Sequence, residues 1–508
     1  MTDFPKTIPA LLERGADDAT ALGAPGGKPL TYRALRTLVA DVRASLAARG
    51  IGPGDRVGIV LDNGPEMAAA FLSIGSAATA APLNPGYRAD EFEFYLTDLR
   101  AKLLVVAEGK DSPAIEVATK LGVPIARLVP RPEQGAGTFT LSFAGDAVPL
   151  GNRAPTTPDD IALVLHTSGT TSRPKIVPLA HRNVCASAKN IAGSLALTSA
   201  DRGLVIMPLF HIHGLIAALL APLSVGGEVY CSTGFNALKF FGWMDEVKPT
   251  WYTGVPTMHQ AILLRAPGNA EIVKNHRLRF VRSSSSSMPV TVIEQIEALY
   301  GVPVIEAYGM TEAAHQMASN ALPPRERKPG TVGPSAGPEI QVVDTSGKPV
   351  PPGVTGEIVI RGPNVMTAYE NNPAANADAF YGDWFRTGDQ GMMDTDGYVT
   401  ITGRLKEIIN RGGEKISPRE VDEIMMGHPA VHQCVTFGMP HAMLGEEVAA
   451  AVVLKQGILA SDAELREFAK VKLADFKVPK KILILTEIPV GATGKLQRIG
   501  LAQKLGLG

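Results

Sequence analysis

A loop rich in hydroxyl groups directly follows an apolar run at residues 161–166. The run, Ile-Ala-Leu-Val-Leu-His, has the length and branching of a buried strand. The loop at 167–178 offers small donors, backbone N–H groups and two cations beside a proline, which suits a polyphosphate. Its glycine lacks the spacing of a Walker A loop. A hydroxyl-rich turn alone is more often a plain surface turn. Its place between a strand and Pro174-Lys175 favours phosphate binding.

Two histidines and a run of serines supply further polar groups beside apolar segments. His211 and His213 stand in Met-Pro-Leu-Phe-His-Ile-His-Gly, at an expected strand-to-helix junction. A lone histidine on an apolar background is more often a packed core residue, whereas a pair beside an aromatic makes a functional role equally reasonable. Ser283–Ser287 lies between an expected strand and an expected helix. We therefore expect a buried polar turn there, although a serine run alone suggests a flexible linker.

The segment Tyr308–Glu312 combines an aromatic ring, a hydroxyl and a carboxylate. Tyr308 carries a flat aromatic face, Thr311 a hydroxyl donor, and Glu312 a hard carboxylate oxygen. Taken alone, Glu312 also suits a helix start, where the dipole stabilises a carboxylate. His315 follows two alanines, whose small side chains leave room around it.

The C-terminal part of the chain carries a second set of polar turns. Asp389 ends the run Trp-Phe-Arg-Thr-Gly-Asp, and its carboxylate is a good acceptor for two neighbouring hydroxyls. Gly403 precedes a new α/β pattern of about 100 residues, typical of a small domain. Ser417, followed by Pro418 and Glu420, predicts a helix start with the serine as its cap. Lys495 stands in a glycine-rich loop, where a lysine is usually solvated.

The elements that must position these groups alternate between helix and strand. Helices are expected at Leu30–Gly50, with Thr31 as its cap, and at Glu66–Ala77, Ser112–Leu121, Arg182–Leu195 and Val290–Tyr300. Strands are expected at Arg56–Leu61, Ala101–Ala107, Ile161–His166, Ile358–Arg361 and Ile482–Leu485. This alternation predicts an α/β fold class, with parallel sheets covered by helices.

Composition describes an ordinary globular chain and excludes several classes of protein. With 508 residues, two or more domains are expected. The chain is 45% hydrophobic and 19% charged with a net charge of −1, so it lacks the basic excess of a nucleic-acid-binding protein. Its three cysteines lie far apart, which favours reduced buried thiols over a zinc site or a disulfide framework.

Membrane and targeting signals are not expected. The longest apolar stretch, Leu215–Leu223, is too short to span a bilayer. The N-terminal residues lack the apolar centre of a signal peptide, and Leu-Gly-Leu-Gly at the other end is not a peroxisomal address. We therefore expect a cytoplasmic protein. The residues indicate no particular oligomeric state.

Five motifs, taken in order, resemble the acyl-adenylate-forming enzymes, the superfamily of acyl-CoA synthetases, luciferases and peptide-synthetase adenylation domains. They are the phosphate loop, Phe-His-Ile-His-Gly, Tyr-Gly-Met-Thr-Glu, Thr-Gly-Asp and the terminal Gly-Lys element, and the resemblance covers nearly the whole chain. The family's phosphate loop usually has glycine where this chain has Ser172 and Ile176. The resemblance implies a large N-terminal domain of helix-covered sheets (1–402), a hinge (403–406) and a small mobile C-terminal α+β lid (407–508).

The resemblance also implies a role for each matching residue. ATP would be bound by Thr167, Ser168, Gly169, Thr170, Thr171, Lys175, Glu306, Ala307, Tyr308, Gly309, Thr311, Asp389, Arg404 and Lys495. Lys495, Thr311 and His211 would be catalytic, Glu312 would bind Mg²⁺, and Lys406 would be the hinge residue. CoA would lie beside Arg411, Gly412 and Gly413, and the acyl substrate beside His211, His213, Ser284, Ser285 and His315.

The implied activity is an ATP-, Mg²⁺- and CoA-dependent carboxylate–CoA ligase that forms an acyl-adenylate and then an acyl-CoA thioester. Within the family, the motifs Thr-Ser-Gly-Thr-Thr-Ser-Arg-Pro-Lys, Phe-His-x-His-Gly and Met-Thr-Glu-Ala-x-His-Gln-Met together look closest to the oxalate–CoA ligases, so oxalate is the expected substrate. No arginine is obvious for the acyl site, and imidazolium and hydroxyl donors are expected to hold the diacid. Malonate, 4-coumarate, a medium-chain fatty acid, transfer to a carrier protein and a non-catalytic binding role are the alternatives.

Overall fold

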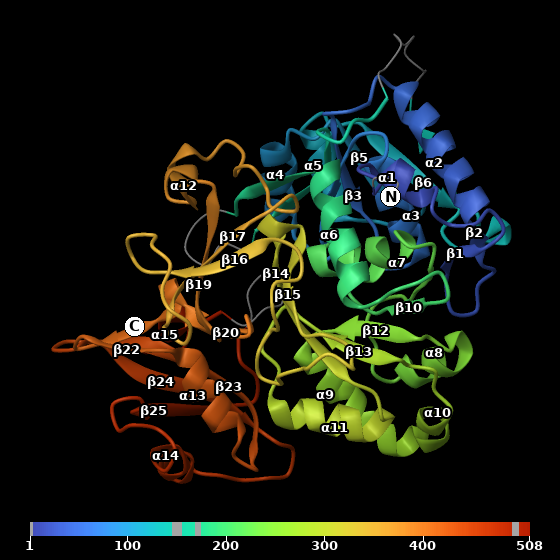
Figure 1. Cartoon of the computed structure of the whole chain (residues 1–508). Coiled ribbons are helices and arrows are strands. Elements are labelled where there is room, and N and C mark those ends of the chain that lie inside the picture. The colour runs from blue at the N-terminus through green and yellow to red at the C-terminus, as the bar shows by residue number, and fades with distance from the viewer. Residues whose placement is uncertain (1–3, 145–154, 168–173, 490–496) are drawn as a thin grey trace. The chain divides into compact units, whose positions relative to one another are not determined.

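Two compact units make up the computed structural model of the chain, which describes residues 4–144, 155–167, 174–489 and 497–508 (Figure 1). The first unit lies within residues 1–167, 176–339 and 361–377, and the second within 168–175, 340–360 and 378–508. A large sheet-containing N-terminal part and a smaller C-terminal part confirm the predicted α/β class. The bounds of these two units differ from the predicted division into residues 1–402 and 407–508. The hinge at 403–406 stays a prediction.

The first sheet has seven strands in the order β7-β6-β5-β3-β4-β8-β9. They are β3 (Arg56–Val60), β4 (Thr79–Pro82), β5 (Leu103–Ala107), β6 (Ile125–Pro130), β7 (Phe139–Phe143), β8 (Ile161–His166) and β9 (Ile176–Ala180). The five central strands are parallel, and β7 and β9 run antiparallel to their neighbours. Val, Ile, Leu and Ala fill these strands because both faces of a parallel sheet are covered.

Helices of the N-terminal region pack around this sheet. They are α1 (Ile8–Leu12), α2 (Tyr32–Ala47), α3 (Pro65–Gly75), α4 (Ala89–Leu99), α5 (Pro113–Lys120) and α6 (His181–Ser194). Apolar side chains of α4 and α5 form one core with those of β3 and β5. The hydroxyl of Thr31 accepts a hydrogen bond from the backbone N of Ala34 at 3.3 Å, which confirms the predicted cap of α2.

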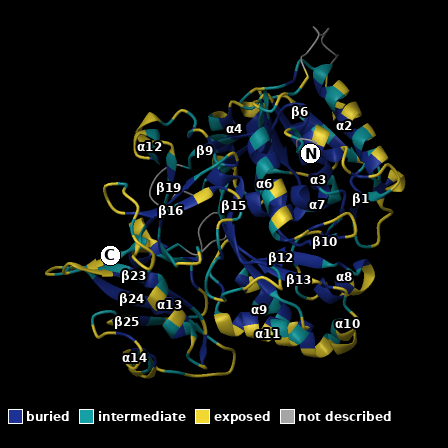
Figure 2. Ribbon diagram, in the orientation of Figure 1, coloured by how far each residue is buried: buried dark blue, intermediate teal, exposed yellow. Residues whose placement is uncertain are grey.

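The second sheet has eight strands in the order β15-β14-β13-β12-β10-β11-β1-β2. They are β1 (Thr20–Gly23), β2 (Leu30–Thr31), β10 (Arg202–Val205), β11 (Glu228–Cys231), β12 (Trp251–Gly254), β13 (Phe280–Ser283), β14 (Val304–Met310) and β15 (His315–Ser319). Figure 2 shows β12 and β13 buried along their whole lengths.

Helices on this sheet are α7 (Ala221–Leu223), α8 (Phe240–Val247), α9 (Pro256–Arg265), α10 (Ala270–Lys274) and α11 (Val290–Tyr300), with a π-helix at His213–Leu220. Helices α8 to α11 cover one face and share a core with β10, β12, β13 and β14 (Figure 1). A further short helix, α12 (Pro373–Ala377), belongs to the same compact unit.

Three neighbouring strands of this sheet end at the same edge. Gly254 at the end of β12 pairs with Ser283 at the end of β13, and Ser283 pairs with Glu306 in β14. Because these strands are parallel, the segments that follow them emerge side by side. This edge therefore brings the serine run, Tyr308 and the end of β12 together.

The second compact unit contains two smaller sheets. One has the order β16-β17-β19-β18 with β20 beside β19, and the other β22-β21-β24-β23 with β25 beside β24. The strands of the first are β16 (Glu339–Val343), β17 (Gly356–Arg361), β18 (Phe380–Tyr381), β19 (Trp384–Met393) and β20 (Val399–Arg404). Those of the second are β21 (Ile409–Arg411), β22 (Glu414–Ile416), β23 (Val431–His441), β24 (Gly445–Leu454) and β25 (Lys481–Leu485). The helices are α13 (Pro418–Met426), α14 (Asp462–Lys470) and α15 (Leu501–Lys504).

The start of α13 differs from the sequence prediction in one respect. Ser417 is the cap residue, and Pro418 opens the helix, as expected. The serine hydroxyl, however, makes no capping bond and donates instead to the backbone O of Thr402. The predicted cap residue is therefore correct, but its hydroxyl fastens α13 to β20 and does not cap the helix.

Two further sequence expectations can be compared with the described residues. Cys185, Cys231 and Cys434 are free buried thiols, as predicted. Within the described residues, no helix is both long enough and apolar enough to cross a membrane.

The buried histidine at the start of α6 should make stability depend on acid. His181 Nδ1 accepts a hydrogen bond from the backbone N of Ile8 at 3.2 Å, and burial lowers its pKa to about 4. The unfolded histidine, with a pKa of roughly 6.5, binds more protons between these values, so stability falls as the pH drops through this window. This group should contribute on the order of 3 kcal/mol to the loss.

We expect His181→Asn to show a smaller fall in thermal midpoint between pH 7 and 4.5 than the parent. Burial also lowers the pKa of His259 to about 4 and lowers the pKa of His166, so part of this acid dependence should remain. His432→Asn, at an exposed position, is the matched control and should keep the full dependence. An unchanged acid dependence in His181→Asn would contradict the assignment.

Candidate active site

The predicted nucleotide residues of β14 are held by close contacts within the first unit. The Glu306 carboxylate accepts a hydrogen bond from the backbone N of Gly330 at 3.0 Å. The backbone O of Ala307 accepts one from the Ser284 hydroxyl at 2.8 Å, and Tyr308 is buried. Gly309 must lack a side chain, because a Cβ there would lie 2.0 Å from the backbone O of His315. Because Gly309 has no side chain, β14 and β15 can approach each other closely at this point.

The predicted metal ligand lies just beyond this strand. Thr311 and Glu312 form a short 3₁₀ turn, Thr311–Ala313. Glu312 is 7% exposed, and its Oε1 accepts a hydrogen bond from the Tyr369 hydroxyl at 2.8 Å. Among the described residues, no group of three or more His, Cys, Asp or Glu could hold a metal ion. A single oriented carboxylate nevertheless fits Mg²⁺, which often takes one or two protein carboxylates together with phosphate oxygens.

The phosphate loop is described only at its ends. His166 of β8 pairs with Ile176 of β9, so the intervening segment starts and ends at one place in the sheet. Thr167 and Lys175 are described residues that directly flank this pair in sequence. Five predicted ATP residues lie outside the described residues: Ser168, Gly169, Thr170, Thr171 and Lys495.

A buried cluster joins residues that the sequence assigned to the acyl site. The rings of His213 and His315 stack with centroids 4.8 Å apart and planes 19° apart. Arg282, which is fully buried, places Nη1 3.2 Å from His213 Nε2 and Nη2 3.2 Å from His315 Nε2. We call these three residues, with Thr253, Ser285 and Gln316, the histidine–arginine cluster.

Elements of the second sheet position the cluster. His213 opens the π-helix, a rare form that often occurs at functional sites. Gly214 allows this turn, since a Cβ there would lie 2.2 Å from the backbone O of Pro208. Ser285 and His315 have positive φ angles of 71° and 99°. Such conformations are strained for residues with a Cβ and concentrate at functional sites.

The serine run is only partly buried, and the His211 side chain is half-buried. Ser283 and Ser284 are buried, but Ser285 and Ser286 are exposed, so the prediction of a wholly buried turn is wrong. The turn leaves the sheet edge after β13 and meets solvent. Ser285 Oγ lies 3.0 Å from His213 Nδ1, whereas the Ser284 hydroxyl is used by Ala307. The half-buried His211 ring packs against Phe210, with centroids 4.6 Å apart.

An arginine that was not obvious from the sequence, Arg282, lies among these side chains. Arg282 forms hydrogen bonds with four side chains, those of His213, Thr253, His315 and Gln316. The sequence did offer a signal, because a cation inside an apolar strand needs polar partners when the strand is buried. Burial lowers the Arg282 pKa to about 9, so the guanidinium stays charged at neutral pH.

In the second unit, the two predicted ribose-binding residues are direct partners. Asp389 in β19 pairs with Arg404 in β20, and Arg404 Nε donates to Asp389 Oδ1 at 3.0 Å. Asp389 is 4% exposed and sits beside Gly388, whose φ is 72°. Lys406 lies in the short turn Leu405–Glu407 that follows.

The predicted CoA residues form a tight hairpin. Arg411 and Glu414 pair across Gly412 and Gly413, whose φ angles are 58° and 99°. Positive φ at both central positions explains the glycine pair. Arg411 donates to both carboxylate oxygens of Glu447, at 2.6 and 3.0 Å, and this bond with Glu447 raises the Arg411 pKa.

We expect Asp389→Asn to raise the KM for ATP by about 10- to 100-fold, since charged hydrogen bonds to two hydroxyls are weakened. The KM for the acid should stay within about threefold, because Asp389 is not assigned to the acyl substrate. Asp396→Asn, an exposed aspartate in the following turn, serves as the control. Steady-state kinetics with each substrate varied separately measure the difference, and an unchanged ATP KM would refute the ribose role.

Comparison with known proteins identifies the family. Residues 12–370 match the model described as AMP-binding enzyme, and residues 420–495 the AMP-binding enzyme C-terminal domain. The oxalate–CoA ligase of Arabidopsis thaliana is 43% identical over 507 residues, which cover 98% of each chain. That of Saccharomyces cerevisiae is 41% identical over 473 residues, covering 88% of this chain and 86% of the relative. The crystal structure of ATP-bound MatB from Rhodopseudomonas palustris is 29% identical, with a TM-score of 0.87 over 98% of both chains.

The chain therefore belongs to the AMP-binding enzyme family of adenylate-forming ligases. Within that family it is an AMP-forming acyl-CoA synthetase. The resemblance inferred from the sequence motifs is confirmed.

Proposed function

We propose that this synthetase joins oxalate to CoA, with conversion of ATP to AMP and pyrophosphate. The observation that carries the proposal is the fully buried Arg282 guanidinium, which contacts both His213 and His315. In the part of the chain that the structure describes, no carboxylate pairs with Arg282, and burial alone shifts its pKa. A buried cation without a counter-charge favours a ligand that brings a second negative group. Two relatives that are oxalate–CoA ligases support the same acid.

In the proposed first step, one substrate carboxylate attacks the α-phosphate of ATP and displaces pyrophosphate. Lys495 and Thr311 oppose the charge that develops on the α-phosphate oxygens. Asp389 and Arg404 hold the ribose, and Tyr308 lies against the adenine. Glu312 would hold Mg²⁺, which when bound neutralises phosphate charge.

In the proposed second step, the CoA sulfur forms a bond to the acyl carbon, the thiol proton is lost and AMP leaves. The small domain turns about Lys406 between the steps, which withdraws Lys495 and brings the hairpin of Arg411, Gly412 and Gly413 to the thiol. Withdrawal of the lysine suits the chemistry, because its charge assists adenylation and has no role in thioester formation.

Pyrophosphate release with ATP, Mg²⁺ and CoA tests the proposal against oxalate, malonate, acetate, 4-coumarate and octanoate. We expect oxalate to exceed the three monocarboxylates by about 100-fold in kcat/KM, because only a diacid supplies the second charge. A preference for malonate would correct the acid but keep the diacid class. A preference for an aromatic or fatty acid would overturn the proposal. Replacing CoA by a phosphopantetheinylated carrier protein tests the acceptor, and faster transfer to the carrier would refute CoA.

A further inference from the structure

The arrangement of donors around His213 and His315 determines which ring nitrogen of each holds a proton. Arg282 Nη1 faces His213 Nε2 and Nη2 faces His315 Nε2, each at 3.2 Å. A guanidinium has only donors, so each facing nitrogen must offer a lone pair. The proton of each neutral ring is then on Nδ1.

Two neighbouring side chains support the same assignment. Arg282 Nη1 also donates to Thr253 Oγ1 at 3.3 Å, and Thr253 Oγ1 lies 2.7 Å from His213 Nε2. The threonine hydroxyl, which accepts from the arginine, keeps its own proton and shares the single lone pair of Nε2 with the arginine as a second donor. On the other side, Arg282 Nη2 donates to Gln316 Oε1 at 3.1 Å. The Gln316 amide nitrogen donates to Ser194 Oγ and to the backbone O of Ala336, which fixes the orientation of the amide.

Charge within the cluster also favours neutral rings. His213 and His315 are 2% and 1% exposed, stack on each other and both contact a buried cation. Protonating either ring would place a second positive charge within hydrogen-bond distance of the guanidinium, in surroundings where such repulsion is poorly screened. The expectation of imidazolium donors is thus replaced by neutral imidazoles beside one arginine cation.

The Nδ1 proton of His213 has a defined acceptor. Nδ1 lies 3.0 Å from Ser285 Oγ, so the ring donates to the serine hydroxyl. Ser285 is exposed, unlike the arginine and the two histidines. Once its oxygen accepts from His213, the hydroxyl keeps its own proton to donate outward. Within the described residues, His213 is the only side-chain partner of that hydroxyl.

We propose that Arg282 is a positioning residue that determines specificity for a second carboxylate. It holds His213 and His315 as neutral Nδ1–H donors, aligns the Ser285 hydroxyl as an outward donor, and supplies the positive charge behind them. A carboxylate, which only accepts hydrogen bonds, complements this set of donors. The inference deepens the proposed function and rests on it for the identity of the acid.

A purely structural arginine would behave differently. Burying a cation without a counter-charge costs more than burying an apolar side chain of similar length. Arg282→Met removes this cost but leaves the acceptors of four buried partners without their donor, so a lowered thermal midpoint is expected in either case. A purely structural role would leave acid selectivity unchanged in Arg282→Met, because the activity with every acid would fall together.

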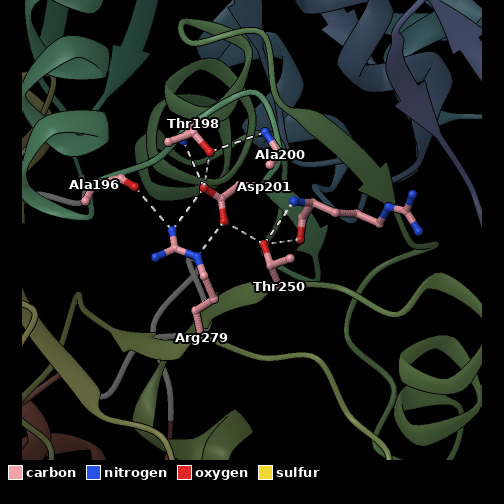
Figure 3. A network of polar contacts seen from close by, with 7 residues as sticks. Ala196, Thr198, Ala200, Asp201, Thr250 and Arg279 are labelled. Carbon is pink, nitrogen blue, oxygen red and sulfur yellow. Dashed lines mark hydrogen bonds and ion pairs between the residues drawn. The ribbon is translucent and has the colours of Figure 1, made fainter.

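Arg279 provides the matched control in the same segment of chain. Its Nε and Nη2 donate to the buried Asp201 carboxylate at 2.8 and 2.9 Å, in a network that also contains Thr198 and Thr250 (Figure 3). Arg279→Met removes a cation from a buried carboxylate, so we expect a lower thermal midpoint with unchanged acid selectivity.

The kinetic test compares Arg282→Met, Arg282→Lys and Arg279→Met with the parent enzyme. We expect Arg282→Met to lower kcat/KM for oxalate about 100-fold, mainly through KM, while kcat/KM for acetate and the KM for ATP change less than about threefold. Arg282→Lys keeps the charge but cannot reach both rings, so it should restore part of the oxalate activity. Equal losses with oxalate and acetate would overturn the proposal, as would parental oxalate kinetics in Arg282→Met.

Ring-¹⁵N histidine spectra of the ligand-free enzyme test the arrangement without any substrate. We expect neutral Nδ1–H signals from His213 and His315 at pH 7.5, assigned by the loss of one signal in His213→Gln and in His315→Gln. An Nε2–H or imidazolium signal from His213 in the parent enzyme would overturn the proposal. Failure of the parent enzyme to prefer any diacid would contradict the proposed function, and the spectra would still decide how Arg282 holds the rings.

Discussion

Replacing Lys495 by alanine is expected to slow acyl-adenylate formation by about 100- to 1,000-fold, the range seen when one group that stabilises developing charge is removed. In the proposed mechanism, the lysine contributes a positive charge while negative charge shifts onto the α-phosphate and pyrophosphate. Thioester formation from a supplied acyl-adenylate should fall by less than about threefold, because the proposed rotation has withdrawn the lysine by then. Pyrophosphate release measures the first half-reaction, and AMP release from the supplied adenylate measures the second.

Lys504→Ala is the matched control, since this exposed lysine of α15 lies nearby in sequence and is assigned no role. It should keep both rates at the parental level. Equal losses in both half-reactions of Lys495→Ala would mean that the lysine supports the fold or a shared binding step. An unchanged adenylation rate would remove it from the mechanism altogether.

Local chemistry allowed much of the fold to be predicted. Helix α11 was predicted at Val290–Tyr300 and has those bounds. Its two signals, the helical spacing of the apolar residues and the preceding Pro289, both lie within this one stretch of sequence. Thr31 was predicted to cap α2 and does so. Bounds of other elements moved by a few residues, as in α3, which was predicted at Glu66–Ala77 and spans Pro65–Gly75. The ends of a helix depend on capping contacts as well as on the spacing of its apolar residues.

The partners of Arg282 could not be predicted in the same way. They come from three other segments of the chain, and His213 is 69 positions away in sequence. Through the family resemblance, the sequence indicated that both histidines belong to one site. It gave no means to predict that Arg282 of β13 contacts both of them. The register of β12 and β13 sets Thr253 beside Arg282, whereas His213 comes from the π-helix and His315 and Gln316 come from β15, so the cluster depends on the order of the whole sheet.

The side-chain orientation of Ser417 shows a related limit. The residue order Ser-Pro-Arg-Glu suits a capping box, yet the hydroxyl bonds to Thr402 of β20, 15 positions earlier. A capping hydroxyl and a tertiary contact are both single hydrogen bonds of similar strength. The choice between them depends on where β20 lies, which no local pattern encodes.

Replacing Glu312 by glutamine is expected to lower the rate of adenylation about 100- to 1,000-fold and to raise the Mg²⁺ concentration needed for half-maximal activity. Glutamine keeps the shape of the side chain but loses the charge that a hard cation requires. The backbone O of Glu312 accepts a hydrogen bond from the N of Met366 at 2.7 Å, and this contact is unaffected by the change. A thermal midpoint close to the parent value should confirm that the fold is kept.

Tyr369→Phe separates orientation of the carboxylate from its charge. The Tyr369 hydroxyl donates to Glu312 Oε1 at 2.8 Å, so its removal leaves the ligand charged but less constrained. Loss of such a supporting hydrogen bond typically weakens metal affinity by about 10- to 100-fold, so the Mg²⁺ requirement should rise while the rate at saturating Mg²⁺ stays within about threefold of the parent. Glu294→Gln, an exposed glutamate of α11, controls for loss of charge alone. If Glu312→Gln responded to Mg²⁺ as Glu294→Gln does, the carboxylate would have no part in binding the metal, and the ion would have to be held by the phosphates and other groups.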